Sequence, residues 1–234
     1  FDDKGRHKGL FGLVRLFIDL QRLGPWAGVA DLHDVLRTKF LRFLFMFTRV
    51  PMAKIDKGRA EKQKLTRQKD KQLIPLPHTI DRYTSVFRSL GYNFSNCFTS
   101  VYSMPPELPR AAHALLGSKT GHWIGFAPFA KHQGKAYPFA LVAETALGLG
   151  RLAGSKVILF GGGSQEIAML KELAAQSENL ICFSGEFNLE VELALMAHID
   201  VMISMDSANM HLASLAGTPV FSIWGATHPY AGFY

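Results

Sequence analysis

The chain has 234 residues, of which 48% are apolar and 19% are charged, so it has enough apolar side chains for a packed core and is not an intrinsically disordered protein. No apolar stretch approaches the roughly 20 residues that a membrane-spanning helix needs. The two cysteines, Cys97 and Cys182, form neither a zinc-ligand pattern nor a disulfide framework, which is typical of proteins from a reducing cytoplasm.

Positive charge is concentrated at the start of the chain. The formal net charge is +7, and residues 1–72 carry 17 Lys or Arg against 8 Asp or Glu, whereas residues 73–234 carry 9 against 11. This asymmetry indicates an anionic partner for the first part, such as nucleic acid, phospholipid headgroups or a phosphorylated acceptor. A solvated basic face would explain the same charge.

Helical segments dominate the first part of the chain. Apolar spacing and glycine or proline stops predict helices over 9–23, 35–47 and 79–90, with a short strand over 26–30. Residues 54–72 are polar and highly charged, and we expect them to form an exposed loop.

In the second part, strands and helices alternate regularly. Strands are predicted over 123–127, 156–160, 180–183, 200–204 and 220–224, and helices over 139–149, 165–176, 189–198 and through 211–216. This alternation predicts parallel βαβ units in an α/β domain with helices covering the sheet. Such a domain binds its ligands at the carboxyl ends of the strands.

Two glycine-containing segments fail as nucleotide signatures. Gly117-Ser118-Lys119-Thr120 lacks the adjacent Gly-Lys of a phosphate loop, and Gly161-Gly162-Gly163 is followed by Glu166 where a dinucleotide fingerprint needs glycine. What remains at 161–166 is a glycine turn that opens a helix. Glu166 there could hold the vicinal hydroxyls of a sugar, or it could merely complement the helix dipole.

The densest polar cluster spans 204–211 and also follows a strand. The free N–H groups of a first helical turn, with the positive end of the dipole, suit a phosphate or diphosphate. Ser207 adds a hydroxyl donor, and His211 lies one turn further along. Asp206 could cap the helix or hold a sugar hydroxyl.

Further basic residues accompany these two segments. Lys131, His132 and Lys135 lie in a loop after the strand over 123–127, where they could complement a diphosphate or simply be surface cations. In the basic part, other charges stand at a predicted strand–helix junction and beyond it, and exposed helix charges would explain most of them. They are His33, Asp34, Arg37, Lys39, Arg59, His78 and Arg82.

Taken in order, these motifs resemble those of family 9 glycosyltransferases, the heptosyltransferases of lipopolysaccharide core synthesis. The matching residues near the end of the chain are Asp206-Ser207-Ala208, His211-Leu212-Ala213, Gly217-Thr218-Pro219 and Trp224-Gly225-Ala226-Thr227-His228-Pro229. Lys135-Ala136-Tyr137-Pro138 resembles the family's Lys-x-Trp-Pro, and 161–166 resembles its glycine turn with an acidic ribose ligand. Residues 31–38 and 78–82 resemble first-domain segments.

The resemblance implies an α/β fold of GT-B type, with two Rossmann-like domains and parallel sheets. We expect an acceptor-side domain over 1–110, with its N-terminal part incomplete, and a nucleotide-sugar-binding domain over 111–234. It further implies an inverting reaction without metal or cofactor, since the ADP-sugar is a substrate. The family's general base is an early aspartate that we expect to precede Phe1, so no catalytic residue is assigned.

The function implied is transfer of a heptose or related sugar from ADP-heptose to a phosphorylated lipid A–core acceptor, by a cytoplasmic enzyme peripheral on the inner membrane. Implied donor-side residues are Ala130, Lys131, Lys135, Glu166, Phe187, Asp206, Ser207, Ala208 and His211. Implied acceptor-side residues are Asp31, His33, Arg37, Lys57, Arg59, His78 and Arg82.

Two departures from the family pattern affect these expectations. Ala208 replaces a glycine, which tightens the phosphate site, and His33-Asp34 replaces Gln-Gly, which suggests a different acceptor or sugar. Two alternatives therefore stay open: a GT-B enzyme with another nucleotide sugar, and a non-catalytic basic protein that binds nucleic acid through residues 1–72. The resemblance itself implies no nucleic-acid partner.

Overall fold

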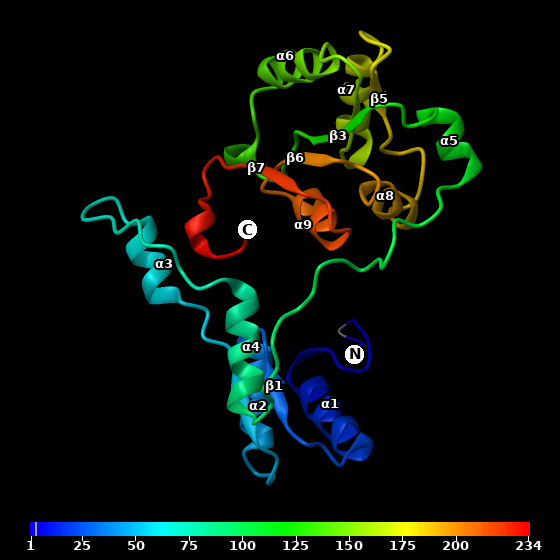
Figure 1. Cartoon of the computed structure of the whole chain (residues 1–234). Helices are drawn as coiled ribbons and strands as arrows, with labels where there is room; N and C mark the ends of the chain where they lie inside the picture. Colours follow the sequence, from blue (N-terminus) through cyan, green and yellow to red (C-terminus); the bar gives the residue numbers. More distant parts are fainter. Residues whose placement is uncertain (3) are drawn as a thin grey trace. The chain divides into compact units, whose positions relative to one another are not determined.

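The computed structural model describes residues 1–2 and 4–234 and divides the chain into two compact units. Unit 1 contains Phe1–Asn96 and Tyr230–Phe233, and unit 2 contains Cys97–Pro229 and Tyr234 (Figure 1). The division therefore falls before residue 110, the expected end of the first domain. In addition, the chain returns to unit 1 near its C-terminus.

Unit 2 is built on a parallel sheet of five strands. They are β3 (His122–Ala127), β4 (Ser155–Leu159), β5 (Leu180–Cys182), β6 (Val201–Met205) and β7 (Val220–Ile223). Their order is β5-β4-β3-β6-β7, and every neighbouring pair is parallel. All five strands expected in this part of the chain are confirmed. Short apolar runs form them because such strands are buried on both faces.

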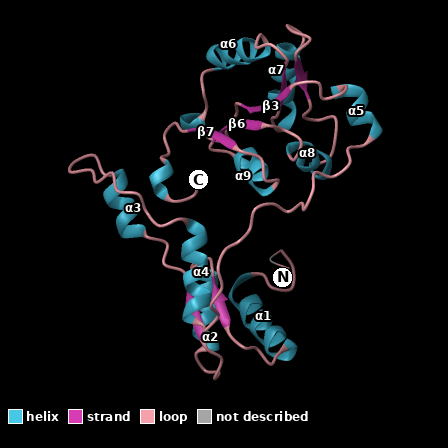
Figure 2. Cartoon of the chain, viewed as in Figure 1, coloured by secondary structure: helices cyan, strands magenta, loops and turns pink. Residues whose placement is uncertain are grey.

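Helices cover both faces of this sheet (Figures 1 and 2). They are α5 (Arg110–Leu116), α6 (Phe139–Gly150), α7 (Gly163–Ala174), α8 (Leu189–Met196) and α9 (Ala208–Leu215). One buried cluster joins α5, α8 and α9 to the sheet, and a second joins α6 and α7 to the other face. Ile158 contributes to the first cluster, whereas Val157 and Leu159 contribute to the second. Alternation along β4 thus builds two cores.

The strand order creates a switch point between β3 and β6. From β3 the chain proceeds outward through β4 to β5, then returns to place β6 and β7 on the opposite side of β3. Loops after β3 and β6 therefore leave the sheet in opposite directions. In an open α/β sheet, ligands bind in the crevice that this divergence leaves at the carboxyl ends of the strands.

The described residues of unit 1 form a parallel pair of short strands and four helices. The strands are β1 (Val29–Asp31) and β2 (Met52–Lys54), and the helices are α1 (Gly9–Leu23), α2 (Leu36–Phe45), α3 (Arg59–Thr66) and α4 (Thr79–Ser89). The helices expected over 9–23, 35–47 and 79–90 are confirmed. The strand expected over 26–30 is found at Val29–Asp31, so its first three predicted residues lie outside β1. Strand β2 was not expected, because its three residues are too few to show a period.

The expectation of a loop over 54–72 is wrong for its middle part, which forms α3. The helix contains Ala, Glu, Lys and Gln, all of which favour helical backbone. Leu65 is the only buried residue of this helix. Charge alone therefore did not distinguish a loop from a short solvated helix.

The chain end attaches to the start of α4 within unit 1. The Leu76 N–H donates to the Tyr230 carbonyl at 2.9 Å, and the Thr79 N–H and hydroxyl donate to the Gly232 carbonyl at 2.6 and 2.7 Å. Gly232 has a φ of 82°, which favours glycine. A short 3₁₀ turn, η2 (Pro229–Ala231), precedes this contact in the chain.

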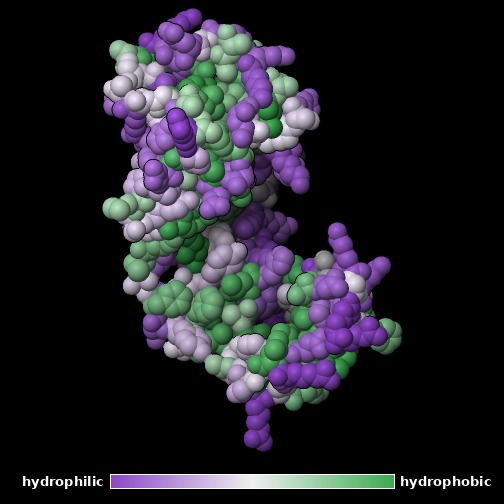
Figure 3. Space-filling view, turned by 90° about the vertical axis from the view of Figure 1, so that its right-hand side faces the viewer, coloured by the Kyte–Doolittle hydropathy of each residue, from purple (hydrophilic) through white to green (hydrophobic). Residues whose placement is uncertain are grey.

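Several apolar side chains of α1, of α2 and of the turn after α2 remain exposed. They include Phe11, Leu36, Phe43 and Phe47, and Figure 3 shows apolar side chains among polar ones over this unit. These side chains are not part of a core formed by the described residues. Among those residues, no helix combines the length and apolar character needed to cross a membrane.

Candidate functional site

Four loops meet at the carboxyl edge of the unit 2 sheet. The loop after β3 contains the 3₁₀ turn η1 (Gln133–Lys135), and the loop after β4 contains Gly161–Gly163. Asp206 and Ser207 follow β6, and residues 224–229 follow β7. Because all these strands are parallel, their following loops lie on the same edge.

Lys135 and Asp206 form an ion pair at the switch point. The Lys135 Nζ lies 2.6 Å from the Asp206 Oδ2, and the exposed fractions of the two side chains are 22% and 6%. The Thr227 hydroxyl donates to the same oxygen at 2.6 Å. Two side chains, from the loops after β3 and β7, therefore converge on one carboxylate oxygen of the loop after β6.

Backbone contacts hold two of these loops together. The Ala226 N–H donates to the Gly134 carbonyl at 2.7 Å. Gly225 permits the approach, because a Cβ there would lie 2.6 Å from the Gly134 oxygen. The loop with Lys135 and the loop with Thr227 are thus positioned before any ligand binds.

The first turn of α9 lies directly after Asp206. Ser207 is the N-cap residue of α9, and its side chain makes no capping hydrogen bond. The Asp206 carboxylate instead accepts from Lys135 and Thr227, so the alternative in which Asp206 caps this helix is not observed. The N–H groups of Ala208 and Asn209 have no acceptor within the helix and, with its dipole, favour an anion.

His211 and Ser207 extend this end of α9. His211 is exposed one turn after Ala208. The Ser207 hydroxyl lies 3.3 Å from the Ser204 hydroxyl, which donates to the Met205 carbonyl. The structure thus brings Lys135, Asp206 and Ser207 to neighbouring positions, as expected, and keeps His211 on the same helix.

Glu166 contacts backbone at the start of α7. Its Oε2 accepts from the Gly162 N–H at 2.7 Å, and Gly162 is the N-cap residue. Gly163 has a φ of 76°, so glycine is favoured at this turn. Stabilisation of the helix start by Glu166 is therefore observed, and its role toward a ribose stays a prediction.

The remaining donor-side residues lie around the same edge with different exposure. Ala130 is half-buried and Lys131 is exposed in the loop after β3. Phe187 stacks on Phe183, with ring centroids 4.7 Å apart, and packs against the first core cluster. Among the described residues, no three His, Cys, Asp or Glu side chains gather in a way that could hold a metal ion.

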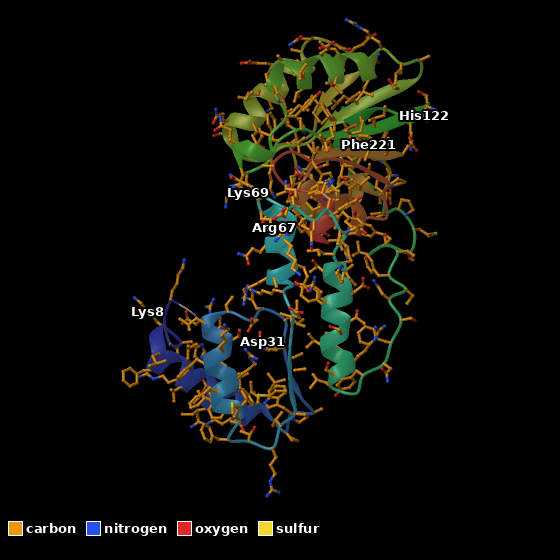
Figure 4. All side chains as sticks on the ribbon, turned by 90° about the vertical axis from the view of Figure 1, so that its left-hand side faces the viewer. Lys8, Asp31, Arg67, Lys69, His122 and Phe221 are labelled. Carbon is orange, nitrogen blue, oxygen red and sulfur yellow. The ribbon has the colours of Figure 1, made fainter. Side chains whose placement is uncertain are left out.

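In unit 1, Asp31 stabilises the turn after β1 (labelled in Figure 4). Its Oδ1 accepts from the N–H groups of His33 and Asp34 at 3.0 and 2.8 Å, and its Oδ2 lies 2.9 Å from the Arg42 Nε, in an ion pair that is not aligned as a hydrogen bond. Burial raises the pKa of Asp31, but the two N–H groups, Thr38 and Arg42 outweigh it, so the pKa falls below its ordinary value of 3.8.

Asp34 contacts arginines of two helices, α2 and α3. The Arg42 Nη2 donates to its carboxylate at 2.9 Å, and Arg59 lies 3.4 Å from the other oxygen and donates to the Asp34 carbonyl. Asp34 has a positive φ of 39°, a conformation that aspartate tolerates better than most residues. A hollow of about 420 Å³ beside this turn is lined by Asp31, His33 and Arg42 among others.

The other acceptor-side residues lie apart from that hollow. Lys57 and Arg59 line a second hollow of about 390 Å³. The His78 ring accepts from the Ile80 N–H at the start of α4, and Arg37 lies over the Phe1 ring at 5.0 Å. Arg82 is buried, with its Nη1 donating to the Asp56 carbonyl. The acceptor-side set is thus not one cluster within unit 1.

Two residues in these networks were missed by the sequence analysis. Thr227 lay within a quoted motif but received no role, and Arg42 looked like an ordinary helix charge. For Thr227, the only indication in the sequence was a hydroxyl side chain in a turn between Gly225 and Pro229. Arg42 lies on a different face of α2 from the apolar residues, so the sequence did not indicate that it pairs with the buried Asp31.

Comparison with known proteins identifies one matching family model, Glycosyltransferase family 9 (heptosyltransferase), which covers residues 31–231. A family 9 glycosyltransferase from Veillonella parvula is similar in structure, with a TM-score of 0.69 and 25% identity, over 100% of this chain and 68% of that one. Escherichia coli heptosyltransferase WaaC with ADP gives 0.64 and 20%, over 94% and 67%. Escherichia coli ADP-heptose lipopolysaccharide heptosyltransferase II gives 0.55 and 17%, over 93% and 68%. No curated protein sequence matches.

Proposed function

The chain belongs to glycosyltransferase family 9, and we propose that it transfers a heptose or a related sugar from an ADP-linked donor to a lipopolysaccharide core acceptor. The α/β fold of GT-B type expected from the sequence is confirmed, and so is a glycosyltransferase activity class. The donor, the acceptor and the roles of individual residues are the proposal.

The observation that supports the donor site best is the convergence of Lys135 and Thr227 on Asp206 at the switch point. A bare carboxylate would repel a diphosphate, but an ion-paired one contributes little net charge. An ammonium group has three N–H donors, so contact with Asp206 is compatible with a further contact to a diphosphate oxygen. In this proposal Asp206 orients Lys135 and reaches hydroxyls of the sugar.

The chemistry requires charge stabilisation where the leaving group forms. In an inverting transfer, an acceptor hydroxyl loses its proton to the general base and attacks the anomeric carbon while the bond from that carbon to the diphosphate oxygen breaks. Negative charge then grows on the departing nucleoside diphosphate. Lys135 and the N–H groups of Ala208 and Asn209 are positioned to stabilise that charge, which is how preorganised donors accelerate a reaction. We propose that no metal or cofactor participates.

An adenosine-linked donor is supported by what the similar enzymes bind. WaaC is described with ADP and with ADP-2-deoxy-2-fluoro heptose. Glu166 lies at the glycine turn beside β4, with one carboxylate oxygen used by Gly162. We propose that its other oxygen contacts the ribose hydroxyls.

For the acceptor, the cation excess of residues 1–72 supports binding of a phosphorylated lipid A–core and of an anionic membrane surface. We therefore propose a cytoplasmic enzyme that is peripheral on the inner membrane. Co-sedimentation with vesicles containing anionic lipid tests this part. Binding that disappears in moderate salt is expected, and equal binding to neutral vesicles would contradict it.

A titration that compares ADP with UDP tests the donor assignment. We expect saturable binding of ADP and at least tenfold weaker binding of UDP, measured by calorimetry on the purified chain. Tighter binding of UDP would replace the ADP-linked donor by a uridine-linked one. Absence of binding by both nucleotides would contradict the proposed donor site.

A further inference from the structure

A group of cations gathers in unit 1 where α3 begins. Arg82 on α4 is only 8% exposed, and its guanidinium lies directly against Gly58, the N-cap residue of α3. A Cβ at residue 58 would lie 2.3 Å from the Arg82 Nη2. Lys57 precedes this turn and Lys62 follows it on α3. Lys62 lies close enough to Lys57 and Arg82 to feel both of their positive charges.

Arg82 is incompletely partnered for a buried group. Its Nη1 donates to the Asp56 carbonyl at 3.0 Å. Its Nε and Nη2 are both buried and have no hydrogen-bond partner among the described residues. Buried guanidinium N–H groups normally have acceptors, because leaving them unpaired costs the full desolvation of the group. The Nη2 faces the N-terminus of α3, where Gly58 lies.

Among the described residues, no neighbouring carboxylate accepts a hydrogen bond from the Arg82 Nε or Nη2. The Asp56 carboxylate accepts from the Gly58 N–H at 2.9 Å, and Glu61 is exposed in the first turn of α3. Burial lowers the pKa of Lys62, and the positive charges of Arg82 and Lys57 lower it further. No side chain caps the helix, so its free N–H groups add positive potential at the same place.

We propose that Lys57, Lys62 and Arg82, together with the first turn of α3, form a binding site for a phosphate group. A phosphate oxygen accepts hydrogen bonds from ammonium, guanidinium and helix N-terminal N–H groups alike. The lysines and the helix N–H groups make the first contacts. The turn at Gly58 then shifts so that the Arg82 Nη2 donates to the phosphate as well.

The source of the phosphate is either the acceptor or free inorganic phosphate. Its assignment to the acceptor rests on the proposed function, whereas the site itself does not. The phosphate site in unit 1 and the donor site in unit 2 consist of different residues. Evidence against one site therefore does not decide about the other.

The first experiment measures the thermal midpoint of the 234-residue chain against inorganic phosphate, with sodium chloride at matched ionic strength. Phosphate should raise the midpoint saturably. Lys62→Gln should weaken the apparent phosphate affinity by about tenfold, as expected for loss of a charge-assisted contact. The control is Lys64→Gln, the same charge change on an exposed side chain of α3, and it should change the affinity by less than about twofold.

Equal effects of phosphate and chloride on the wild type, or equal effects of Lys62→Gln and Lys64→Gln, would overturn the site. Arg82→Met provides a second variant. It should leave a folded chain whose midpoint no longer responds to phosphate, because a buried cation without full partners is replaced by an apolar group. If Arg82→Met does not fold, the comparison of Lys62→Gln with Lys64→Gln still tests the phosphate site.

The second experiment separates the two sources of phosphate. In a transfer assay with the full-length enzyme, Lys62→Gln should raise the KM for a phosphorylated lipid A–core acceptor about tenfold and leave the KM for its dephosphorylated form unchanged. An equal rise for both acceptors would overturn the assignment to the acceptor. The same chain is titrated with ADP in parallel. If the wild type does not bind ADP, the proposed function is contradicted. If it binds ADP but phosphate does not raise its thermal midpoint, only the phosphate site is contradicted.

Discussion

Lys135 and Asp206 are 71 residues apart in the sequence, yet their side chains meet at 2.6 Å. The contact exists because β3 and β6 are neighbours in the sheet although β4 and β5 intervene in the chain. It lies where the loops after these two strands diverge, which is the ligand position of an open α/β sheet. Three predictions concern this contact and its surroundings, and a fourth concerns Asp31 in unit 1.

Replacing Asp206 by Asn should separate function from stability. Asparagine keeps an oxygen for Thr227 and Lys135 but removes the charge that orients the ammonium group, and the N-cap of α9 is Ser207. We expect turnover to fall by about a hundredfold, the scale of a lost preorganised group, while the thermal midpoint changes little. Turnover of the full-length enzyme that carries the substitution and the thermal midpoint of the purified variant measure these two quantities.

Thr227→Val serves as the matched test, because it removes only the hydroxyl that shares the Asp206 oxygen. It should raise the donor KM with a smaller effect on kcat. Wild-type turnover in Asp206→Asn would show that this carboxylate has only a structural role.

Replacing Lys135 by Ala should weaken donor binding by about tenfold or more, because a charge-assisted contact to the diphosphate is lost. Calorimetric titration with ADP checks this. Lys171→Ala removes the same charge from an exposed position in unit 2 and should leave ADP affinity unchanged. Equal affinities for the two variants would exclude a direct contact of Lys135 with the diphosphate.

Glu166 is expected to combine a structural and a binding role. Glu166→Gln keeps an oxygen for the Gly162 N–H, so the start of α7 should stay intact, whereas Glu166→Ala should cost about 1 kcal/mol of stability. A carboxylate on the ribose predicts that both variants bind ADP several-fold more weakly. If Glu166→Gln binds ADP like the wild type, Glu166 serves only the helix.

Asp31 should make unit 1 sensitive to acid. Its pKa lies below 3.8 in the folded chain, so its stabilising contribution is present above pH 3.8 and is lost as the pH falls through the folded pKa. Asp31→Asn should therefore lower the stability near pH 7 by about 2 kcal/mol and flatten the decline below pH 4. Urea unfolding followed by circular dichroism between pH 3 and 7 measures the difference.

Asp70→Asn is the control for that experiment, since Asp70 is exposed and asparagine also tolerates its positive φ of 49°. It should leave the acid profile unchanged. An identical profile for Asp31→Asn and the wild type would mean that the turn after β1 does not depend on this carboxylate.

The sequence by itself determined the five strands of unit 2, its helices apart from α5, and the residues of its glycine and Asp-Ser turns. Apolar runs bounded by glycine and helical spacing are local patterns, so five strands could be located before their order was known. Segment 54–72 was interpreted wrongly, because α3 has a single buried apolar side chain, Leu65, and no period to reveal it.

Only the tertiary structure decided which side chains meet. The strand order β5-β4-β3-β6-β7 brings Lys135, Asp206 and Thr227 to one point. The packing of α4 against Gly58 buries Arg82, and its Nε and Nη2 have no hydrogen-bond partner among the described residues. Neither contact has a local signal, because each depends on how distant segments are ordered in space. Short-range pattern specifies an element, whereas contacts between elements depend on their relative positions after burial of the apolar faces.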